Sequence, residues 1–218
     1  MKSKISRAMC SALACVALGG ALSACVPLVV GGGMVAGSLM AVDRRTTGTQ
    51  VEDESIELKA NARIRETFND KARISVTSYN RQVLLTGEVG NAQDKEKLTR
   101  LVEAVDNVRT VVNETTVAPF TATLSQRSGD TFITGKVRAS LLDAKDLQAS
   151  AFKVVTENKV VYLMGIVTPR EAKRAAEIAR GVNDVTKVVR LFEVISEDEL
   201  ARYQPKQAPV TTDASPSQ

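Results

Sequence analysis

The chain has 218 residues, of which 25% are charged, 44% hydrophobic and only 4% aromatic. This length suits one large or two small domains, and the composition is ordinary for a folded protein. Histidine is absent, which excludes histidine-based acid–base catalysis, Ser-His and Cys-His nucleophile pairs and histidine metal ligands. We therefore expect a protein that is not an enzyme and that carries no cofactor.

The formal net charge of +4 overstates how basic the functional chain is. Lys2, Lys4 and Arg7 lie in a segment that we expect to be removed. Taking these three from 29 basic residues leaves 26 against 25 acidic ones, a net charge of +1. Neither a basic field nor aromatic stacking platforms are then available for nucleic acid, so we expect no nucleic-acid partner.

Residues 1–24 are predicted to be a lipoprotein signal peptide. A positively charged start precedes an apolar, alanine-rich run from Ala8 to Leu22, as in secretory signals. The following Leu-Ser-Ala-Cys at 22–25 resembles the lipobox of bacterial lipoproteins. This resemblance implies cleavage before Cys25, acylation of Cys25 and stable anchoring by several acyl chains. Val26 rather than Asp after the cysteine implies the outer membrane.

Residues 25–54 are predicted to be the lipidated N-terminus and a flexible tether. The part from Val26 to Val42 is apolar and contains four glycines. It could be a second membrane-contacting stretch, but four glycines oppose a stable helix, and we favour the tether.

The remaining sequence contains an internal repeat. Residues 83–89 (VLLTGEV) recur 78 positions later as residues 161–167 (VYLMGIV). Two copies are too few for a solenoid and indicate a tandem duplication. In the predicted alignment, the second copy has five extra residues before its first strand. On the first helix, this alignment pairs Ile133 with Ala60, Val137 with Ile64, and Leu141 with Phe68.

Each copy is predicted to fold as helix, strand, strand, helix, strand, with two helices on one face of a three-stranded mixed sheet, so the fold class is α+β. The first module spans 55–118, with elements at 55–68, 73–78, 82–89, 92–105 and 109–117. The second module spans 130–195, with elements at 131–143, 152–157, 160–167, 169–181 and 186–195. Residues 119–129 are predicted to be a linker, and 196–218 a mostly disordered tail beyond about Tyr203.

The hairpin pattern Val-x-Leu-x-Gly-x-Val and a helix ending in a Val-x-x-Val turn resemble the BON domain. Two such copies after a lipobox, with Gly-Thr-Gln-Val at 48–51, make the chain similar to the dual-BON outer-membrane lipoproteins. The resemblance covers Cys25 to Ile195 and is closest in the second copy, at 130–134 and 163–173. It implies a lipoprotein on the periplasmic face of the outer membrane that binds anionic, phosphatidylglycerol-like phospholipid through its second BON domain. It also implies a role in envelope integrity at division sites.

The opening helix of the second copy carries the candidate site. Ile133, Val137 and Leu141 share one face and are predicted to be core. A second face is apolar with basic edges, which suits contact with an anionic membrane. The predicted phospholipid-binding residues are Phe132, Gly135, Lys136, Arg138, Ala139 and Leu142. The corresponding positions of the first copy, in the predicted alignment, are polar.

Two alternatives stay open at this stage. Phe132 and Leu142 could instead pack against the first copy. The module could also be a protein-interaction scaffold for outer-membrane assembly machinery or cell-wall amidase regulators. The position of Met164 is undecided as well, because its strand face is opposite that of Leu163 and could be exposed or lie under the helices.

Overall fold

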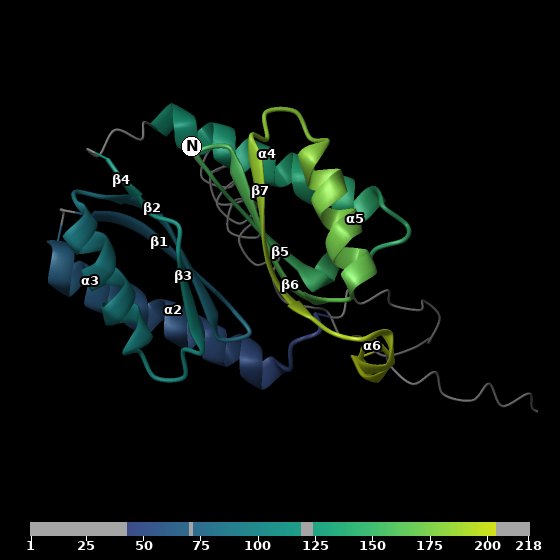
Figure 1. Ribbon diagram of the computed structural model, residues 1–218, viewed down its shortest axis with the longest axis horizontal. Helices are drawn as coiled ribbons and strands as arrows, with labels where there is room; N and C mark the ends of the chain where they lie inside the picture. The colour runs from purple at the N-terminus through teal and green to yellow at the C-terminus, as the bar shows by residue number, and fades with distance from the viewer. Residues whose placement is uncertain (1–42, 70–71, 119–123, 204–218) are drawn as a thin grey trace, which may run out of the picture. The chain divides into compact units, whose positions relative to one another are not determined.

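The computed structural model describes residues 43–69, 72–118 and 124–203 (Figure 1). The predicted signal peptide, the lipidation site Cys25, the apolar stretch 26–42 and the end of the tail beyond Tyr203 lie outside these residues. Among the helices of the described ranges, none is both long and apolar enough to cross a membrane.

The first module has the predicted order of helices and strands. Its elements are α2 (Thr47–Phe68), β1 (Ala72–Tyr79), β2 (Gln82–Val89), α3 (Ala92–Glu103), β3 (Thr110–Asn113) and β4 (Thr116–Val117). β1 pairs with β2 antiparallel, and β2 pairs with β3 and β4 in parallel. The last strand, predicted as continuous, is divided in two around Thr115, whose backbone N–H donates to the Asn113 side chain at 3.1 Å.

The second module repeats this arrangement. Its elements are α4 (Leu124–Asp143), the short 3₁₀ helix η3 (Ala149–Ala151), β5 (Phe152–Glu157), β6 (Val160–Val167), α5 (Pro169–Arg180) and β7 (Lys187–Val194). β6 pairs antiparallel with β5 and parallel with β7. The predicted α+β fold, with a mixed sheet and two helices in each module, is confirmed.

Two helices begin earlier than the sequence pattern predicts. α2 begins at Thr47 because the Thr46 side chain accepts a hydrogen bond from the Thr49 amide at 3.1 Å and caps the helix. Residues 47–54, predicted as flexible tether, are therefore helical. α4 begins at Leu124, inside the predicted linker 119–129. The tail is also helical at its start, where α6 spans Glu197–Tyr203.

A buried aspartate on the first helix of each module holds the hairpin turn. Asp53 accepts hydrogen bonds from the amides of Asn80 and Arg81 at 2.8 Å, and Asp130 accepts those of residues 158–159 at 2.9 Å. Both residues of each turn have positive φ, as in two-residue hairpin turns. The two aspartates are 77 residues apart, so they identify equivalent positions on α2 and α4.

This equivalence corrects the predicted alignment of the repeats. The true pairs along the helices are Ile56 with Ile133, Ala60 with Val137, and Ile64 with Leu141, all buried. The predicted pairs were displaced by four residues, or about one helical turn, because an apolar stripe recurs at that spacing and matches itself after a shift. The second module has one extra residue before its first strand rather than five.

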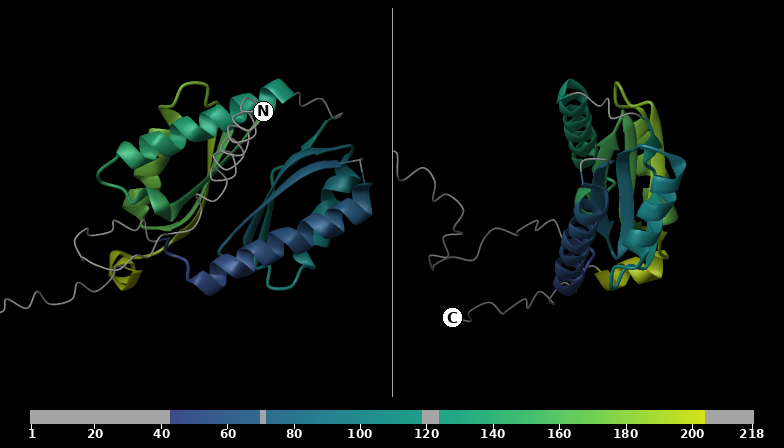
Figure 2. Two further views of the ribbon diagram at one scale, coloured as in Figure 1. Left: turned by 180° about the vertical axis from the view of Figure 1, so that it is seen from behind. Right: turned by 90° about the vertical axis from the view of Figure 1, so that its left-hand side faces the viewer.

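In each module the helices cover one face of the sheet, as the left view of Figure 2 shows for α2 and α4. The buried cores lie between the helices and this face. Glycine occupies the equivalent position in both hairpins, at Gly87 and Gly165, for a local steric reason. A Cβ at Gly87 would collide with the Arg73 carbonyl, and one at Gly165 with the Ala151 carbonyl. Only glycine leaves room for the neighbouring backbone at these positions.

The opposite faces of the two sheets meet in a third apolar cluster. It contains Tyr79 and Leu84 from the first module and Tyr162, Met164 and Ile166 from the second. Met164 is fully buried there, so it is neither exposed nor under the helices of its own module. Leu200 of α6 joins the same cluster. The two modules are thus held together through their sheets, which leaves the outer surfaces of the helices free.

Candidate phospholipid-binding helix and adjoining cavity

The α4 helix separates its apolar residues onto two faces. Ile133, Val137 and Leu141 are buried in the core of the second module. On the other face, Phe132 is 67% exposed and Leu142 is 76% exposed. Packing against the first copy does not bury either residue, so that alternative is wrong.

Lys136 lies beside Phe132 and is partly neutralised. Its Nζ is 4.8 Å from the centre of the Phe132 ring, a cation–π contact between residues one helical turn apart. The same Nζ is 3.1 Å from a carboxylate oxygen of Asp184 and donates to the Asn183 carbonyl at 3.1 Å. Lys136 therefore contacts the aromatic ring and also shares its charge with the turn that follows α5.

Arg138 presents a less compensated charge. Its Nη2 donates to the Val154 carbonyl at 3.3 Å. Among the described residues, no carboxylate forms an ion pair with Arg138. Because a guanidinium offers five donors in a planar fork, most of its hydrogen-bonding capacity stays available for a phosphate.

Gly135 and Ala139, the two small residues of the predicted set, add little side-chain bulk to the surface of α4. A Cβ at Gly135 would meet nothing within 4 Å. Ala139 lines a shallow groove of ≈ 570 Å³ together with Lys136 and residues of α5. The predicted residues of α4 therefore form one exposed face that is apolar, with Lys136 and Arg138 at its margins.

The corrected alignment changes what the first module presents at these positions. Phe132 corresponds to Ser55 and Leu142 to Arg65, so the contrast between the modules holds at both ends of the face. At the position of Gly135, however, α2 carries Leu58, which is 71% exposed, and one further apolar residue, Val51, is 61% exposed. The first module is thus less uniformly polar than the sequence analysis predicted.

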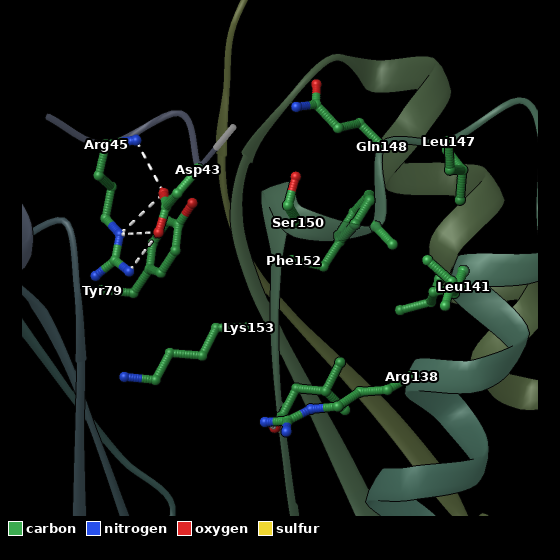
Figure 3. A pocket seen from close by; sticks show the side chains of 13 residues that line it. Asp43, Arg45, Tyr79, Arg138, Leu141, Leu147, Gln148, Ser150, Phe152 and Lys153 are labelled. Atoms are coloured by element: carbon green, nitrogen blue, oxygen red, sulfur yellow. Dashed lines mark hydrogen bonds and ion pairs between the residues drawn. The ribbon is translucent and has the colours of Figure 1, made fainter. Parts of the chain in front are cut away.

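Sequence reasoning missed a cavity of ≈ 770 Å³ that adjoins this face (Figure 3). One side is formed by the second module, with Leu141, Leu147 and Phe152. The other side is formed by Tyr79 and Arg45, which come from the first module and the segment before it. No local pattern marks this cavity, because its walls are brought together only when the two sheets pack.

The segment before α2 forms the polar wall of the cavity. Arg45 donates to Asp43 at 2.6 Å and to Asp53 at 2.7 Å, and its guanidinium carbon lies 4.2 Å from the centre of the Tyr79 ring. Burial alone would lower the pKa of Arg45, but its hydrogen bonds to Asp43 and Asp53 and the charge of Asp43 outweigh burial and raise the pKa. Burial, reinforced by the charge of Asp43, raises the pKa of Tyr79 to about 12. Both side chains therefore keep their protonation state at neutral pH.

Arg44, also missed by sequence reasoning, is buried against the second module. It donates to both carboxylate oxygens of Glu171 and to the Ile166 carbonyl. Glu171 in turn accepts the Thr168 amide at 2.9 Å in the predicted capping box. Burial would raise the pKa of Glu171, but the bonds from Arg44 and Thr168 outweigh it and lower the pKa.

The described residues contain no group of three or more cysteine, aspartate or glutamate side chains placed to hold a metal ion. What the site offers is an exposed apolar face, nearby cations and a partly apolar cavity. This arrangement can bind an amphiphile, with apolar contacts for hydrocarbon and guanidinium donors for an anion.

Comparisons with known proteins agree with this architecture. The BON domain model matches residues 52–119 and 129–196. The chain is 39% identical to the outer membrane lipoprotein DolP of Haemophilus influenzae over 80% of this chain and 90% of that protein. It is 34% identical to a 21 kDa hemolysin of Actinobacillus pleuropneumoniae, over 71% of this chain and 80% of that one.

Among solved structures, the C-terminal domain of CdsD from Chlamydia trachomatis matches with a TM-score of 0.28 and 13% identity. It covers 64% of this chain and 96% of that one. This likeness is too weak to carry an argument. The two domain matches and the 39% identity are decisive by contrast. The chain belongs to the BON-domain family, and within it to the dual-BON outer-membrane lipoproteins of the DolP family.

Proposed function

We propose that this protein binds anionic phospholipid on the periplasmic face of the outer membrane through the exposed face of α4. The observation that carries the proposal is the exposure of Phe132 and Leu142 on a helix whose residues Ile133, Val137 and Leu141 are buried in the core. A soluble module has no folding reason to hold a phenyl ring in water beside a lysine. At a membrane interface the ring enters the acyl boundary while the cation meets the headgroups.

The energies involved suit reversible contact. Full burial of a phenylalanine or leucine side chain contributes roughly 1.5–3 kcal/mol, and each cation near an anionic surface contributes about 1 kcal/mol. Such a face alone would hold the protein weakly. Acyl chains on Cys25, as predicted from the lipobox, would keep α4 at a high effective concentration near the membrane. The helix then selects the lipid composition, while the anchor provides retention.

In this proposal the protein is a non-catalytic binding module without a cofactor. Its role in envelope integrity at division sites is what the family resemblance implies, and anionic lipid enrichment would supply the positional signal. The sheet-to-sheet contact between the modules supports the proposal, because it directs the helices outward and keeps α4 accessible.

The test is co-sedimentation with vesicles of phosphatidylglycerol and phosphatidylethanolamine. The protein is the chain from residue 25 with Cys25→Ser, which retains all three apolar clusters. Phe132→Glu should reduce pelleting by at least about tenfold, because it replaces buried hydrocarbon with a charge that the anionic surface repels. Leu58→Glu is the matched control on α2 and should pellet normally. A folded Phe132→Glu variant that pellets like the unmodified chain would rule out the proposal.

A protein-interaction scaffold is the second candidate, and the exposure of Leu58 and Val51 on α2 favours it. These residues are seven positions apart and therefore share one helix face. Partners would be outer-membrane assembly machinery or cell-wall amidase regulators. If this candidate is correct, Leu58→Glu abolishes envelope function in cells, whereas Phe132→Glu leaves envelope function unchanged.

A further inference from the structure

The cavity beside α4 has an apolar floor. Leu141, Leu147, Phe152 and Val154 of the second module line it, and Leu142 stands at its exposed end. Its volume of ≈ 770 Å³ falls within the range of pockets that bind small ligands in proteins, roughly 300–1,000 Å³. A cavity of this size and lining suits hydrocarbon better than a polar metabolite.

Cations stand around this apolar floor. Arg45, Arg138 and Lys153 line the cavity against a single carboxylate, that of Asp43. Arg45 is held by two aspartates, and Lys153 Nζ is 3.0 Å from Glu57. Arg138, whose described contact is with a backbone carbonyl, is the cation best placed to receive an anion. The charge of the lining therefore complements a ligand that is apolar at one end and anionic at the other.

The cavity is continuous with the proposed membrane face. Arg138 and Leu142 are four residues apart on α4, so they lie on the same side of the helix. Both belong to the predicted phospholipid-binding set, and both line the cavity. A lipid held at the membrane face would thus have hydrocarbon contacts both with Leu142 and with the apolar residues that line the cavity.

We infer that this cavity accepts one acyl chain of an anionic phospholipid, with the phosphate of that lipid at Arg138. The inference rests on the proposed function and extends it from contact with a membrane surface to capture of a single lipid molecule. The outer face of α4 meets the bilayer through Phe132, while the cavity binds one chain drawn away from it. Phe132 does not line the cavity, so the two activities can be separated by mutation.

The probe is a single-chain lysophosphatidylglycerol below its critical micelle concentration, added to the Cys25→Ser chain from residue 25. Binding should be one to one, with methyl chemical-shift changes at Leu141, Leu147 and Val154. Glycerol phosphate, which lacks the chain, and lysophosphatidylcholine, which lacks the net negative charge, should each bind at least about tenfold more weakly. Shift changes confined to the Phe132 face of α4 would overturn the inference.

Ser150→Trp tests the cavity directly, because it places a large ring where Ser150 lines the space (Figure 3). It should weaken lysophosphatidylglycerol binding by at least about tenfold and leave vesicle pelleting unchanged. Phe132→Glu should do the reverse. Ala104→Trp, at an exposed position of the first module, controls for the added ring. If a folded Ser150→Trp variant keeps full lysophosphatidylglycerol affinity, the inference is wrong. If instead Phe132→Glu pellets with vesicles like the unmodified chain, the proposed function is wrong.

Discussion

Arg44 and Glu171 form a buried ion pair, with Arg44 Nη2 2.7 Å from Glu171 Oε1 and both side chains at most 4% exposed. Arg44 precedes the first helix of the first module, whereas Glu171 caps α5 of the second. Residues 43–46, which directly precede α2, are therefore attached through Arg44 to the second module, which carries the candidate lipid-binding helix. This attachment also fixes Asp43 and Arg45, which form the polar wall of the cavity.

Arg44→Met should destabilise the protein strongly. It leaves the Glu171 carboxylate buried without its cation, and breaking such a pair from one side costs about 3–5 kcal/mol in the free energy of unfolding. Arg174→Met is the matched control, because its ion pair with Asp146 is about half exposed and contributes at most about 1 kcal/mol. Urea denaturation followed by circular dichroism measures both. Equal losses from the two variants would show that Arg44 does not have this structural role.

Stability should fall in acid through Glu171 and Asp53. Burial opposes ionisation of both carboxylates, but hydrogen bonds outweigh it: the pKa of Glu171 is lowered from 4.5 and that of Asp53 from 3.8. The folded protein therefore binds these protons more weakly than the unfolded chain does. Their contribution is complete above about pH 4.5 and is lost as the pH falls through the lowered values.

Urea midpoints between pH 7 and pH 3 check this expectation. In Arg44→Met, the pKa of Glu171 loses its main lowering influence, so the decline with acid should be shallower than in the unmodified chain. Parallel declines in the two proteins would mean that other carboxylates account for the acid sensitivity.

Asp130→Ala should loosen the hairpin of the second module. Its carboxylate accepts the amides of Asn158 and Lys159, and losing two bonds to a charged acceptor costs about 3–6 kcal/mol. Asp53→Ala should cost more, since Asp53 also accepts from Ser78 Oγ at 2.6 Å and from Arg45. Hydrogen exchange of the turn amides localises the change. Exposed Asp143→Ala, expected within about 0.5 kcal/mol of the unmodified chain, is the reference.

Arg138→Gln should weaken binding to phosphatidylglycerol vesicles more than Lys136→Gln. Arg138 loses about 1 kcal/mol of headgroup attraction, or roughly fivefold in affinity, whereas Lys136 is already shared with Asp184. Both effects should shrink as the salt concentration rises, because screening shortens the reach of the surface potential. Vesicle pelleting at low and at high salt measures the difference. A larger effect for Lys136→Gln would place the phosphate contact at the other edge of the face.

Local patterns were enough to predict each module. The alternation of apolar residues, the turn residues and the Thr168 capping box located the strands and helices to within a few residues, except where α2 and α4 extend upstream. The exposed position of Phe132 also followed from helical periodicity, since Ile133, Val137 and Leu141 define the buried side. These features depend on neighbours close in sequence, so the sequence carries them directly.

Contacts between distant residues needed the tertiary structure. Asp53 and Asp130, which hold their turns, fix the alignment of α2 with α4, because an apolar stripe alone also matches itself after a shift of one helical turn. Likewise, nothing near Met164 in the sequence indicates that it is buried against the first module, and nothing near Arg44 indicates that it is buried against the second. The sequence by itself determined the two modules and their exposed helix face. Packing between the sheets decided where the modules meet and created the cavity, since burial depends on which distant surfaces exclude water together.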